Sequence, residues 1–422
     1  MSREMKHSGA AWIGNIPKHW DVGRYKFCGT LEKGKLPSET NIEGKGLPII
    51  GASEMNGKPP RQFTEEILPM CTEQDILILW DGANAGLVAH GMCGIVSSTA
   101  VVLKRDTEKL NSDYLYYQLK SNETFFRDKV NGTTIPHMNS AYLDELPPLI
   151  PPLAEQKAIA DFLDKKCNEI DELVALQEKM IEELRAYKQS VITEAVCKGL
   201  NPNVPMKDSG VEWIGEIPEA WSIVKLGLLT SKIGSGSTPS GGAEVYTEDG
   251  VKFMRSQNVY FEGFDLTNVA HISQEIDEQM KSTRVYKGDI LFNITGGSIG
   301  RCCDVDATLG AANVNQHVCI VRPTKILTKY LKYYLQSNSG QTQVRLLQTG
   351  GNRDGLSADA FKKFLILVPT CSEQEEIADY LDKKCSEIDQ LISIKQQKIV
   401  ELNDYKKSLI YEYATGKKEV KL

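Results

Sequence analysis

One segment occurs twice in this chain, half a chain length apart. It reads EQKAIADFLDKKCNEID at residues 155–171 and EQEEIADYLDKKCSEID at residues 373–389, so thirteen of seventeen positions are identical at an offset of 218. A second block, SGAAWIGNIPKHW at residues 8–20, returns as SGVEWIGEIPEAW at residues 209–221. Shorter echoes between these blocks keep the same order. The repeats predict a tandem duplication in which both halves fold alike.

The first repeated segment opens a long region of helical composition. Residues 154–196 contain no Pro and no Gly, and Ala, Leu, Glu, Lys and Gln dominate. Gly199 and Gly416 follow the two copies, as helix stop signals do. Apolar residues recur at steps of three, four or seven, which is typical of a coiled-coil seam. The predicted helix-pairing residues are Ile159, Leu163, Ile170, Leu173, Leu184, Ile377, Leu381, Ile388, Leu391 and Leu402.

An amphipathic helix of about 43 residues, roughly 65 Å long, cannot bury its apolar stripe alone. The other copy in the same chain is the expected partner. Each globular segment precedes its helix, so a pseudo-two-fold axis would make the two helices antiparallel. The alternative is that each helix packs only on its own globular segment.

The remaining segments indicate an α/β fold of the α+β kind. Apolar runs rich in β-branched residues predict strands near residues 76–80, 99–103, 318–322 and 364–368. The expected organisation is a first globular domain at residues 1–152, a first long helix at 153–200, a linker at 201–208, a second globular domain at 209–370 and a second long helix at 371–422.

Composition places the chain among ordinary water-soluble proteins. No apolar run approaches the roughly 18 residues of a membrane span, and the N-terminus lacks a signal-peptide core. Ten cysteines without CxxC pairs indicate free thiols in a reducing compartment, so we expect a cytoplasmic protein without a metal site. The net charge is −7, of which the two long-helix segments carry −3 and −2. An acidic total therefore does not exclude local basic surfaces.

Catalytic motifs are not evident in the sequence. It contains no P-loop and no Gly-x-Ser-x-Gly elbow. The glycine-rich stretch at residues 234–242 is interrupted by Thr-Pro and favours a flexible turn over a dinucleotide cradle. The triplets at residues 43–45 and 419–421 match the ExK of nucleases, but chance produces such triplets in any chain rich in Glu and Lys. We predict a non-catalytic chain.

Both halves carry polar, aromatic and basic loops between their apolar strands. In the first half these loops span residues 51–63, 80–86 and 131–139; in the second they span 254–263, 294–301, 313–317 and 349–355. Arg, Asn, Gln and Ser are side chains that read base edges and hold phosphates. Each loop taken singly is equally well explained as an ordinary solvated loop. The set, repeated in both halves with different residues, favours a two-part reader.

The order of the blocks resembles that of the specificity subunits of type I restriction–modification systems. The resemblance rests on WIGxIPxxW, a variable domain, and a Pro-flanked EQxxIAxxLDxxxxxID helix, all repeated. GSTPS and KFMRSQNV in the second half, and TIPHMNSAYLDELPPLIPPLAEQ at residues 134–156, agree with it. The first half departs from the pattern, because it lacks the GxTP loop and has PIIGASEM in place of FMRSQNV.

The resemblance implies two target recognition domains, each reading one half of a bipartite, asymmetric site on double-stranded DNA. It implies that the paired helices act as a spacer and dock two modification (methyltransferase) subunits, which would bind S-adenosylmethionine and methylate adenine. Restriction/translocase subunits would add cleavage, and this chain would need no cofactor. The candidate DNA-binding residues are Ser53, Asn56, Lys58, Arg61, Asn84, Thr133, His137, Arg255, Gln257, Asn258, Ser298, Arg301, Gln316, Asn352 and Arg353, and the alignment adds Met55.

Three other interpretations stay open at this point. The chain could be a stand-alone two-domain DNA-binding regulator that acts without a methyltransferase. It could be a protein scaffold whose helices recruit partners. An enzyme would require a site that none of the motifs reveals.

Overall fold

The computed structural model describes residues 3–105, 108–130, 136–348 and 355–420. It divides into two compact units, Met1–Glu178 with Gln396–Leu422 (unit 1) and Lys179–Lys395 (unit 2). The two long helices, α5 (Leu153–Lys198) and α11 (Cys371–Ala414), each contribute one part to each unit. Among the described residues, no helix is long and apolar enough to cross a membrane.

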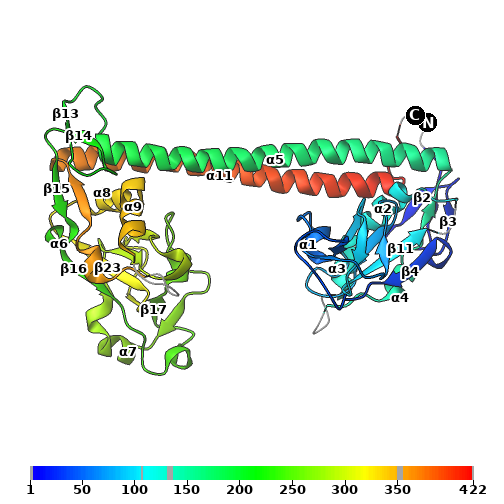
Figure 1. The fold of residues 1–422 in the computed structure, drawn as a ribbon, viewed down its shortest axis with the longest axis horizontal. Coiled ribbons are helices and arrows are strands. Elements are labelled where there is room, and N and C mark those ends of the chain that lie inside the picture. Colours follow the sequence, from blue (N-terminus) through cyan, green and yellow to red (C-terminus); the bar gives the residue numbers. More distant parts are fainter. Residues whose placement is uncertain (1–2, 106–107, 131–135, 349–354, 421–422) are drawn as a thin grey trace. The chain divides into compact units, whose positions relative to one another are not determined.

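The described residues of unit 1 form two four-stranded sheets and two small two-stranded ones; Figure 1 shows their place beside the long helices. The first sheet has the antiparallel order β4 (Gly29–Lys33), β11 (Ala100–Arg105), β8 (Ile76–Leu79), β9 (Val88–His90). The second has the order β6 (Phe63–Thr64), β5 (Leu47–Ile50), β10 (Gly94–Val96), β7 (Met70–Cys71), with β5 and β10 parallel. The pairs are β1 (Met5–His7) with β2 (Asn15–Pro17) and β3 (Asp21–Val22) with β12 (Leu149–Ile150). The short helices are α1 (Ala52–Met55), α2 (Ser112–Ser121), α3 (Glu123–Val130) and α4 (Ser140–Asp144).

Unit 2 repeats this topology strand for strand. Its first sheet has the order β16 (Thr230–Ser235), β23 (Val318–Pro323), β20 (Ile290–Asn293), β21 (Cys302–Asp304). Its second has the order β18 (Ala270–Ile272), β17 (Val251–Met254), β22 (Ala312–Val314), β19 (Arg284–Val285), with β17 and β22 parallel. The pairs are β13 (Met206–Asp208) with β14 (Glu216–Pro218) and β15 (Ser222–Lys225) with β24 (Leu365–Val368). The helices are α6 (Leu226–Leu229), α7 (Gln274–Gln279), α8 (Thr328–Gln336), α9 (Asn338–Leu347) and α10 (Ala358–Phe361). The predicted duplication and mixed fold are confirmed.

One predicted boundary needs correction. The segment 201–208 was expected to be a linker, but its last three residues form β13, which pairs with β14. The counterpart in unit 1 is β1, which pairs with β2 in the same way. No strand is evident from the sequence at these residues, because a three-residue strand is too short to show a period.

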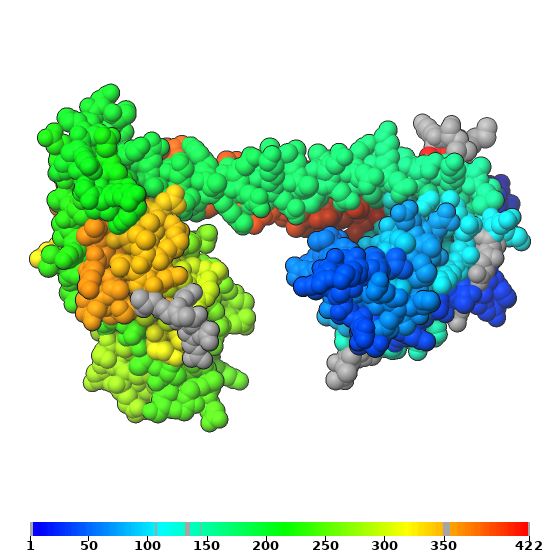
Figure 2. Space-filling view, in the orientation of Figure 1, coloured from blue at the N-terminus to red at the C-terminus, as the bar shows by residue number. Residues whose placement is uncertain are grey.

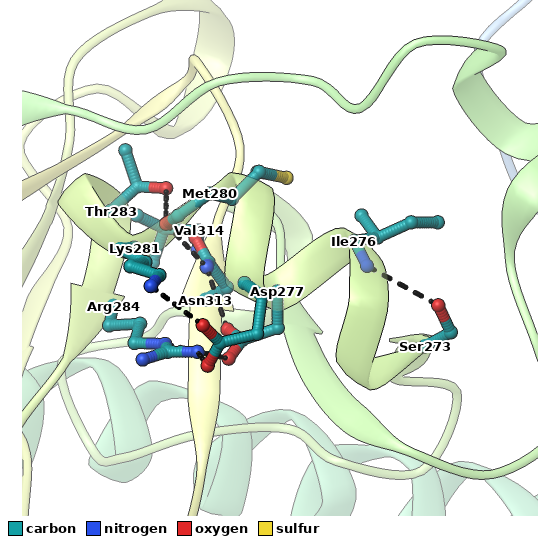
Figure 3. A network of polar contacts seen from close by, with 10 residues as sticks. Ser273, Ile276, Asp277, Met280, Lys281, Thr283, Arg284, Asn313 and Val314 are labelled. Atoms are coloured by element: carbon teal, nitrogen blue, oxygen red, sulfur yellow. Dashed lines mark hydrogen bonds and ion pairs between the residues drawn. The ribbon is translucent and has the colours of Figure 1, made fainter.

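In unit 2, a buried polar network fixes α7 against β22 (Figure 3). Asn313 is fully buried, and its Nδ2 donates to Asp277 Oδ1 and to the carbonyl of Met280, both at 3.0 Å. Arg284 Nε donates to Asp277 Oδ2 at 2.7 Å. Ser273 caps the helix by accepting from the backbone N–H of Ile276. The bonds of Asn313 are buried and those of Arg284 and Ser273 are partly buried. Together they hold a short helix that would be unstable by itself.

The long helices pair in antiparallel orientation within each unit. In unit 1 the rings of Phe162 and Tyr413 lie 4.5 Å apart, while Lys406 donates to Asp171 at 2.7 Å. Higher residue numbers on α5 thus meet lower numbers on α11. In unit 2 Lys188 donates to Asp389 at 2.8 Å, and this pair is the repeat counterpart of Lys406 and Asp171. The antiparallel prediction is confirmed.

Each unit also packs its globular part on both helices. In unit 1 the hydroxyl of Tyr117 donates to Asp164 on α5 at 2.7 Å, and that of Tyr114 donates to the carbonyl of Ala414 on α11 at 3.1 Å. In unit 2 the counterpart hydroxyls donate to Asp382 on α11 and to the carbonyl of Val196 on α5. The helices therefore pair with each other and also pack on the globular parts, which combines the two arrangements considered from the sequence.

Two of the predicted helix-pairing residues lie outside the seam. Leu173 and Leu391 are 45% and 47% exposed. The heptad positions that face the partner helix fall one residue later, at Val174 on α5 and at Ile392 on α11, both of which are partly buried. The remaining eight are buried or partly buried: Ile159, Leu163, Ile170, Leu184, Ile377, Leu381, Ile388 and Leu402.

Candidate nucleic-acid interface

Loops from separate parts of unit 1 gather around the turn between β10 and β11. The backbone N–H groups of Trp80 and Asp81 donate to the carbonyl of Thr99 at 2.7 and 3.1 Å. The N–H of Ser97 donates to the carbonyl of Ile50, just before the loop that starts at residue 51. The N–H of Met138, in the described part of the third loop, donates to the carbonyl of Trp80 at 2.8 Å. The three loops that the sequence singled out in this half thus meet at one edge of the unit through their described residues.

A charged cluster lies at this edge. Lys33, at the end of β4, donates to Asp81 Oδ2 at 3.0 Å, and the Nδ1 of His137 bonds to Asp81 Oδ1. The rings of His137 and Trp80 meet edge to face at 6.4 Å. Partial burial opposes ionisation of Asp81, but the hydrogen bonds from His137 and Lys33 outweigh it and hold the pKa of this carboxyl below its usual value. A carboxylate and two basic side chains are therefore presented together on an accessible edge.

The corresponding edge of unit 2 carries a different, mostly uncharged set. The Oγ1 of Thr295 lies 2.7 Å from Nδ1 of His317, and Nε2 of Gln316 lies 3.1 Å from Nε2 of His317. The hydroxyl of Thr238 donates to Gln316 Oε1. Thr295 occupies the repeat position of Asp81. The same place in the fold thus presents a carboxylate in one unit and hydroxyl, amide and imidazole groups in the other.

A tight loop after β17 brings the predicted Arg255 segment to the same edge. The N–H of Asn315 donates to the carbonyl of Met254 at 3.1 Å. Nδ2 of Asn293, at the end of β20, donates to the carbonyl of Ser256 at 2.8 Å. The loop is thereby tied to the strands that also position Thr295 and Gln316.

Two candidate contacts are structural residues. Asn258 is 3% exposed; its Oδ1 accepts from the N–H of Arg255 and its Nδ2 donates to the carbonyl of Asp265. Both ends of this amide are used to shape the loop. Met55 is 7% exposed and packs in the core with Ile50. Neither side chain is accessible for a DNA contact in this arrangement, because the loop turns that start at Arg255 and Gly51 point them inward.

Two arginines of unit 2 remain free of carboxylates. The guanidinium of Arg255 lies 5.8 Å from the ring centroid of Tyr246, and that of Arg301 lies 4.8 Å from the ring of Tyr260. Arg255 also donates to the carbonyl of Asn268 at 3.2 Å. Neither arginine forms an ion pair within the described part of the chain. A cation that is held by an aromatic ring and lacks a counter-ion is suited to a phosphate or a guanine edge.

The other predicted contacts differ in exposure. Ser53, Asn56, Lys58, Arg61, Asn84, His137, Gln257 and Gln316 are exposed, and Ser298 is half-buried. Thr133, Asn352 and Arg353 lie outside the described residues. The residues predicted to contact DNA did not include Lys33, Asp81, Thr238, Thr295 and His317. Three of them, Asp81, Thr295 and His317, nevertheless lie in loops that the sequence had singled out, at residues 80–86, 294–301 and 313–317.

No metal site is evident in the ranges that the structure describes, where no three His, Cys, Asp or Glu side chains gather closely enough to hold an ion. All eight thiols with a raised pKa are buried ones, and desolvation is the leading cause in each. A thiolate nucleophile is therefore not favoured at these positions.

Known proteins resemble this chain over nearly its full length. Residues 17–185 and 218–404 match the family described as "Type I restriction modification DNA specificity domain". The type I restriction enzyme MjaVIII specificity subunit of Methanocaldococcus jannaschii is 30% identical, with 96% of this chain and 94% of the relative covered. The EcoBI specificity subunit of Escherichia coli is 24% identical, with 90% and 81% covered.

A solved chain from work on complex assembly and conformational transition of the type I R-M system has the same fold. Its TM-score is 0.67 at 16% identity, with 94% of this chain and 98% of that chain covered. The family match covers both halves, each with its strands, its polar edge and its part of the long helices. The chain therefore belongs to the family of type I restriction–modification specificity subunits.

Proposed function

We propose that this chain is the DNA sequence-recognition subunit of a type I restriction–modification complex, and that each unit reads one half of a bipartite site. One observation carries the proposal: two units with the same strand order place unlike side chains at the same edge. Lys33, Asp81 and His137 occupy it in unit 1, whereas Thr238, Thr295 and Gln316 occupy it in unit 2. Two units with the same strand order but different side chains at the polar edge are suited to two half-sites of different sequence.

The two edges favour different base contacts. A carboxylate such as Asp81 accepts hydrogen bonds, so it favours the exocyclic amino group of cytosine or adenine. An amide such as Gln316 both donates and accepts, which suits adenine. Arg255 and Arg301 would add phosphate or guanine contacts on the side of unit 2. Because neither cation is ion-paired within the described residues, both are available to an anionic ligand without first breaking an ion pair.

Substitution of Arg255 tests the assignment of unit 2. We expect Arg255→Ala to relax the second half-site by about 1–3 kcal/mol per affected base pair, with the first half-site unchanged. The measurement is the selection of bound sequences from random DNA by the chain with its partner subunits. Lys35, an exposed lysine of unit 1, provides the control: Lys35→Ala should leave the second half-site intact. Equal loss at both half-sites in Arg255→Ala would show a general phosphate or folding role.

The long helices are proposed to dock two modification subunits, which would bring S-adenosylmethionine for adenine methylation. Restriction/translocase subunits would complete the assembly, in the cytoplasm where the DNA lies. The support is an apolar patch on the helix pair of each unit. Unit 1 exposes Leu173, Leu176 and Tyr405, and unit 2 exposes their repeat counterparts Leu391, Ile394 and Tyr187. Figure 2 shows α5 uncovered along this view as far as its C-terminal end, where the β13–β14 hairpin lies.

These patches lie beside the seam on one side of each helix pair. Leu173 and Tyr405 each directly precede a residue of the seam. In an antiparallel helix pair, the residues that precede equivalent seam positions on the two helices lie on the same side of the pair. Solvent-facing leucine, isoleucine and tyrosine at heptad spacing are suited to a further helix, because a helical partner would bury them as a second seam. The duplication gives two such patches, in agreement with two docked subunits.

A charge in one patch tests this docking. The double substitution Leu391→Lys with Ile394→Lys should lower the number of bound modification subunits from two to one, because an interface core does not tolerate buried unpaired charges. Native mass spectrometry of the assembled complex gives the stoichiometry. Ser386→Lys with Gln390→Lys adds the same charge to exposed positions on another side of α11 and should leave two subunits bound. Retention of two subunits in the patch variant would contradict the proposal.

A further inference from the structure

Unit 2 contains a groove whose lining includes none of the residues of the polar edge. Its volume is about 810 Å³, and it lies between the last turns of α5, the β13–β14 hairpin and Tyr380 of α11. Glu194 and Ala195 line it on the helix side, and Ile214 and Glu216 line it on the hairpin side. Figure 1 shows this hairpin beside the C-terminal end of α5.

The duplication shows what occupies the counterpart of this groove in unit 1. There the last turns of α11 meet the β1–β2 hairpin, and Tyr413 stands at the repeat position of Ala195. The ring of Tyr413 packs on Phe162, the counterpart of Tyr380, at 4.5 Å. In unit 1 the Tyr413 ring therefore covers Phe162. In unit 2 Ala195 is too small to cover the corresponding ring of Tyr380, which is 38% exposed.

Two lysines of the C-terminal segment also lie in the unit 1 counterpart of the groove. Lys417 donates from Nζ to the carbonyl of Ile13 at 2.7 Å and also to that of Asn15. Lys418 forms an ion pair with Glu412 at 2.7 Å. Partial burial lowers the pKa of Lys417, as expected for an ammonium group that is drawn against the hairpin. The chain's own C-terminal segment therefore supplies one aromatic ring and two cations to this place.

Unit 2 has the same acceptors without these donors. The carbonyls of Ile214 and Glu216 correspond to those of Ile13 and Asn15, and no described side chain donates to them. Glu194, the counterpart of Glu412, is exposed and forms no ion pair with a described residue, Lys198 included. After α5 the chain continues with Gly199, Leu200 and Asn201, none of which is a lysine. Lys198 lines the groove but forms no ion pair with Glu194. Glu216 adds a second negative charge to the groove.

We propose that this groove binds a segment of a partner protein that carries an aromatic residue followed, about four residues later, by two adjacent lysines or arginines. The aromatic ring would cover Tyr380 beside Ala195. One cation would pair with Glu194 and the other would donate to the carbonyls of Ile214 and Glu216. The groove is then a peptide site present in unit 2 alone, because unit 1 fills its own copy. This inference does not depend on which DNA sequence the units read.

A labelled peptide with the sequence of residues 411–422, YEYATGKKEVKL, is the probe, since it contains the required pattern. We expect saturable binding to the full chain by fluorescence anisotropy, and about tenfold weaker binding, which is about 1.4 kcal/mol, to Glu194→Lys. A peptide with both lysines of its KK pair changed to Glu should not bind. Glu182→Lys, an equal charge change at an exposed position of α5 outside the groove, should leave the affinity unchanged.

Four results would overturn the proposal. They are the absence of saturable binding, equal affinity for Glu194→Lys and the unaltered chain, equal weakening by Glu182→Lys, and loss of binding with Glu412→Lys alone, which would place the peptide in unit 1. A concentration-dependent dimer that Glu194→Lys abolishes, measured by sedimentation, would instead identify the occupant as the tail of a second copy. All these substitutions are at exposed positions or, for Glu412, at a half-buried one, so folding is not their expected effect.

Discussion

Replacing Leu381 by alanine should destabilise unit 2 by about 2–5 kcal/mol. Leu381 is fully buried, where α11 meets the core that also contains Trp221 and Tyr330. Removal of its branched side chain leaves a cavity that rigid helices on both sides cannot close. Urea denaturation followed by hydrogen–deuterium exchange of peptides from unit 2 gives the change in the free energy of unfolding.

Leu391 provides the matched control for this prediction. It lies on the same helix and was predicted from the sequence to pair in the same way, but it is 47% exposed. Leu391→Ala should change the free energy of unfolding by only about 0.5 kcal/mol. Leu163→Ala, at the repeat counterpart of Leu381, should destabilise unit 1 and leave the exchange of unit 2 unaltered. Equal losses from Leu381→Ala and Leu391→Ala would contradict the seam described here.

Lengthening both helices by one heptad should lengthen the gap between the two half-sites by about three base pairs. The proposal is that the helices set this gap. Seven residues add about 10 Å of helix, and three base pairs of B-DNA span about the same length. The insertions belong after Lys179 in α5 and after Gln397 in α11, which are repeat counterparts, so that a full heptad keeps the seam in phase.

The DNA sequences bound by the lengthened chain measure the effect. The same seven residues placed after Pro202, between α5 and β13, should leave the gap unaltered. A gap of unchanged length in the doubly lengthened chain would show that the helices do not determine the spacing. A four-residue insertion in a single helix should also alter the gap, but it shifts the seam and is expected to cost stability as well.

The sequence was sufficient to predict those features that depend on local pattern and on the repeat. It predicted the two long helices, because their composition and heptad period extend over twelve turns, and it predicted the strands at residues 76–80 and 318–322 from dense β-branched runs. The antiparallel pairing followed from the order of blocks. The exact residues of the seam could not be predicted in this way. Leu173 and Val174 are both apolar, and only packing decides which of them faces the partner helix.

The polar edge was harder to predict. Asp81 and His137 are 56 positions apart, and Lys33 is a further 48 positions from Asp81. Such contacts arise from sheet register, which no local pattern in the sequence reveals. Asn258 is of a residue type that often contacts bases, but its side-chain amide bonds to backbone groups of its own loop and is therefore buried. The groove of unit 2 was not predicted from the sequence, because it depends on one small residue, Ala195, at the repeat position of Tyr413 in unit 1.

The most direct test of the two-part reader is the motif that the unaltered chain selects from random DNA together with its partner subunits. We expect two short specific blocks of different sequence, separated by a gap of fixed length in which all four bases are accepted equally. A single uninterrupted block, two blocks with a variable gap, or no sequence preference would contradict it.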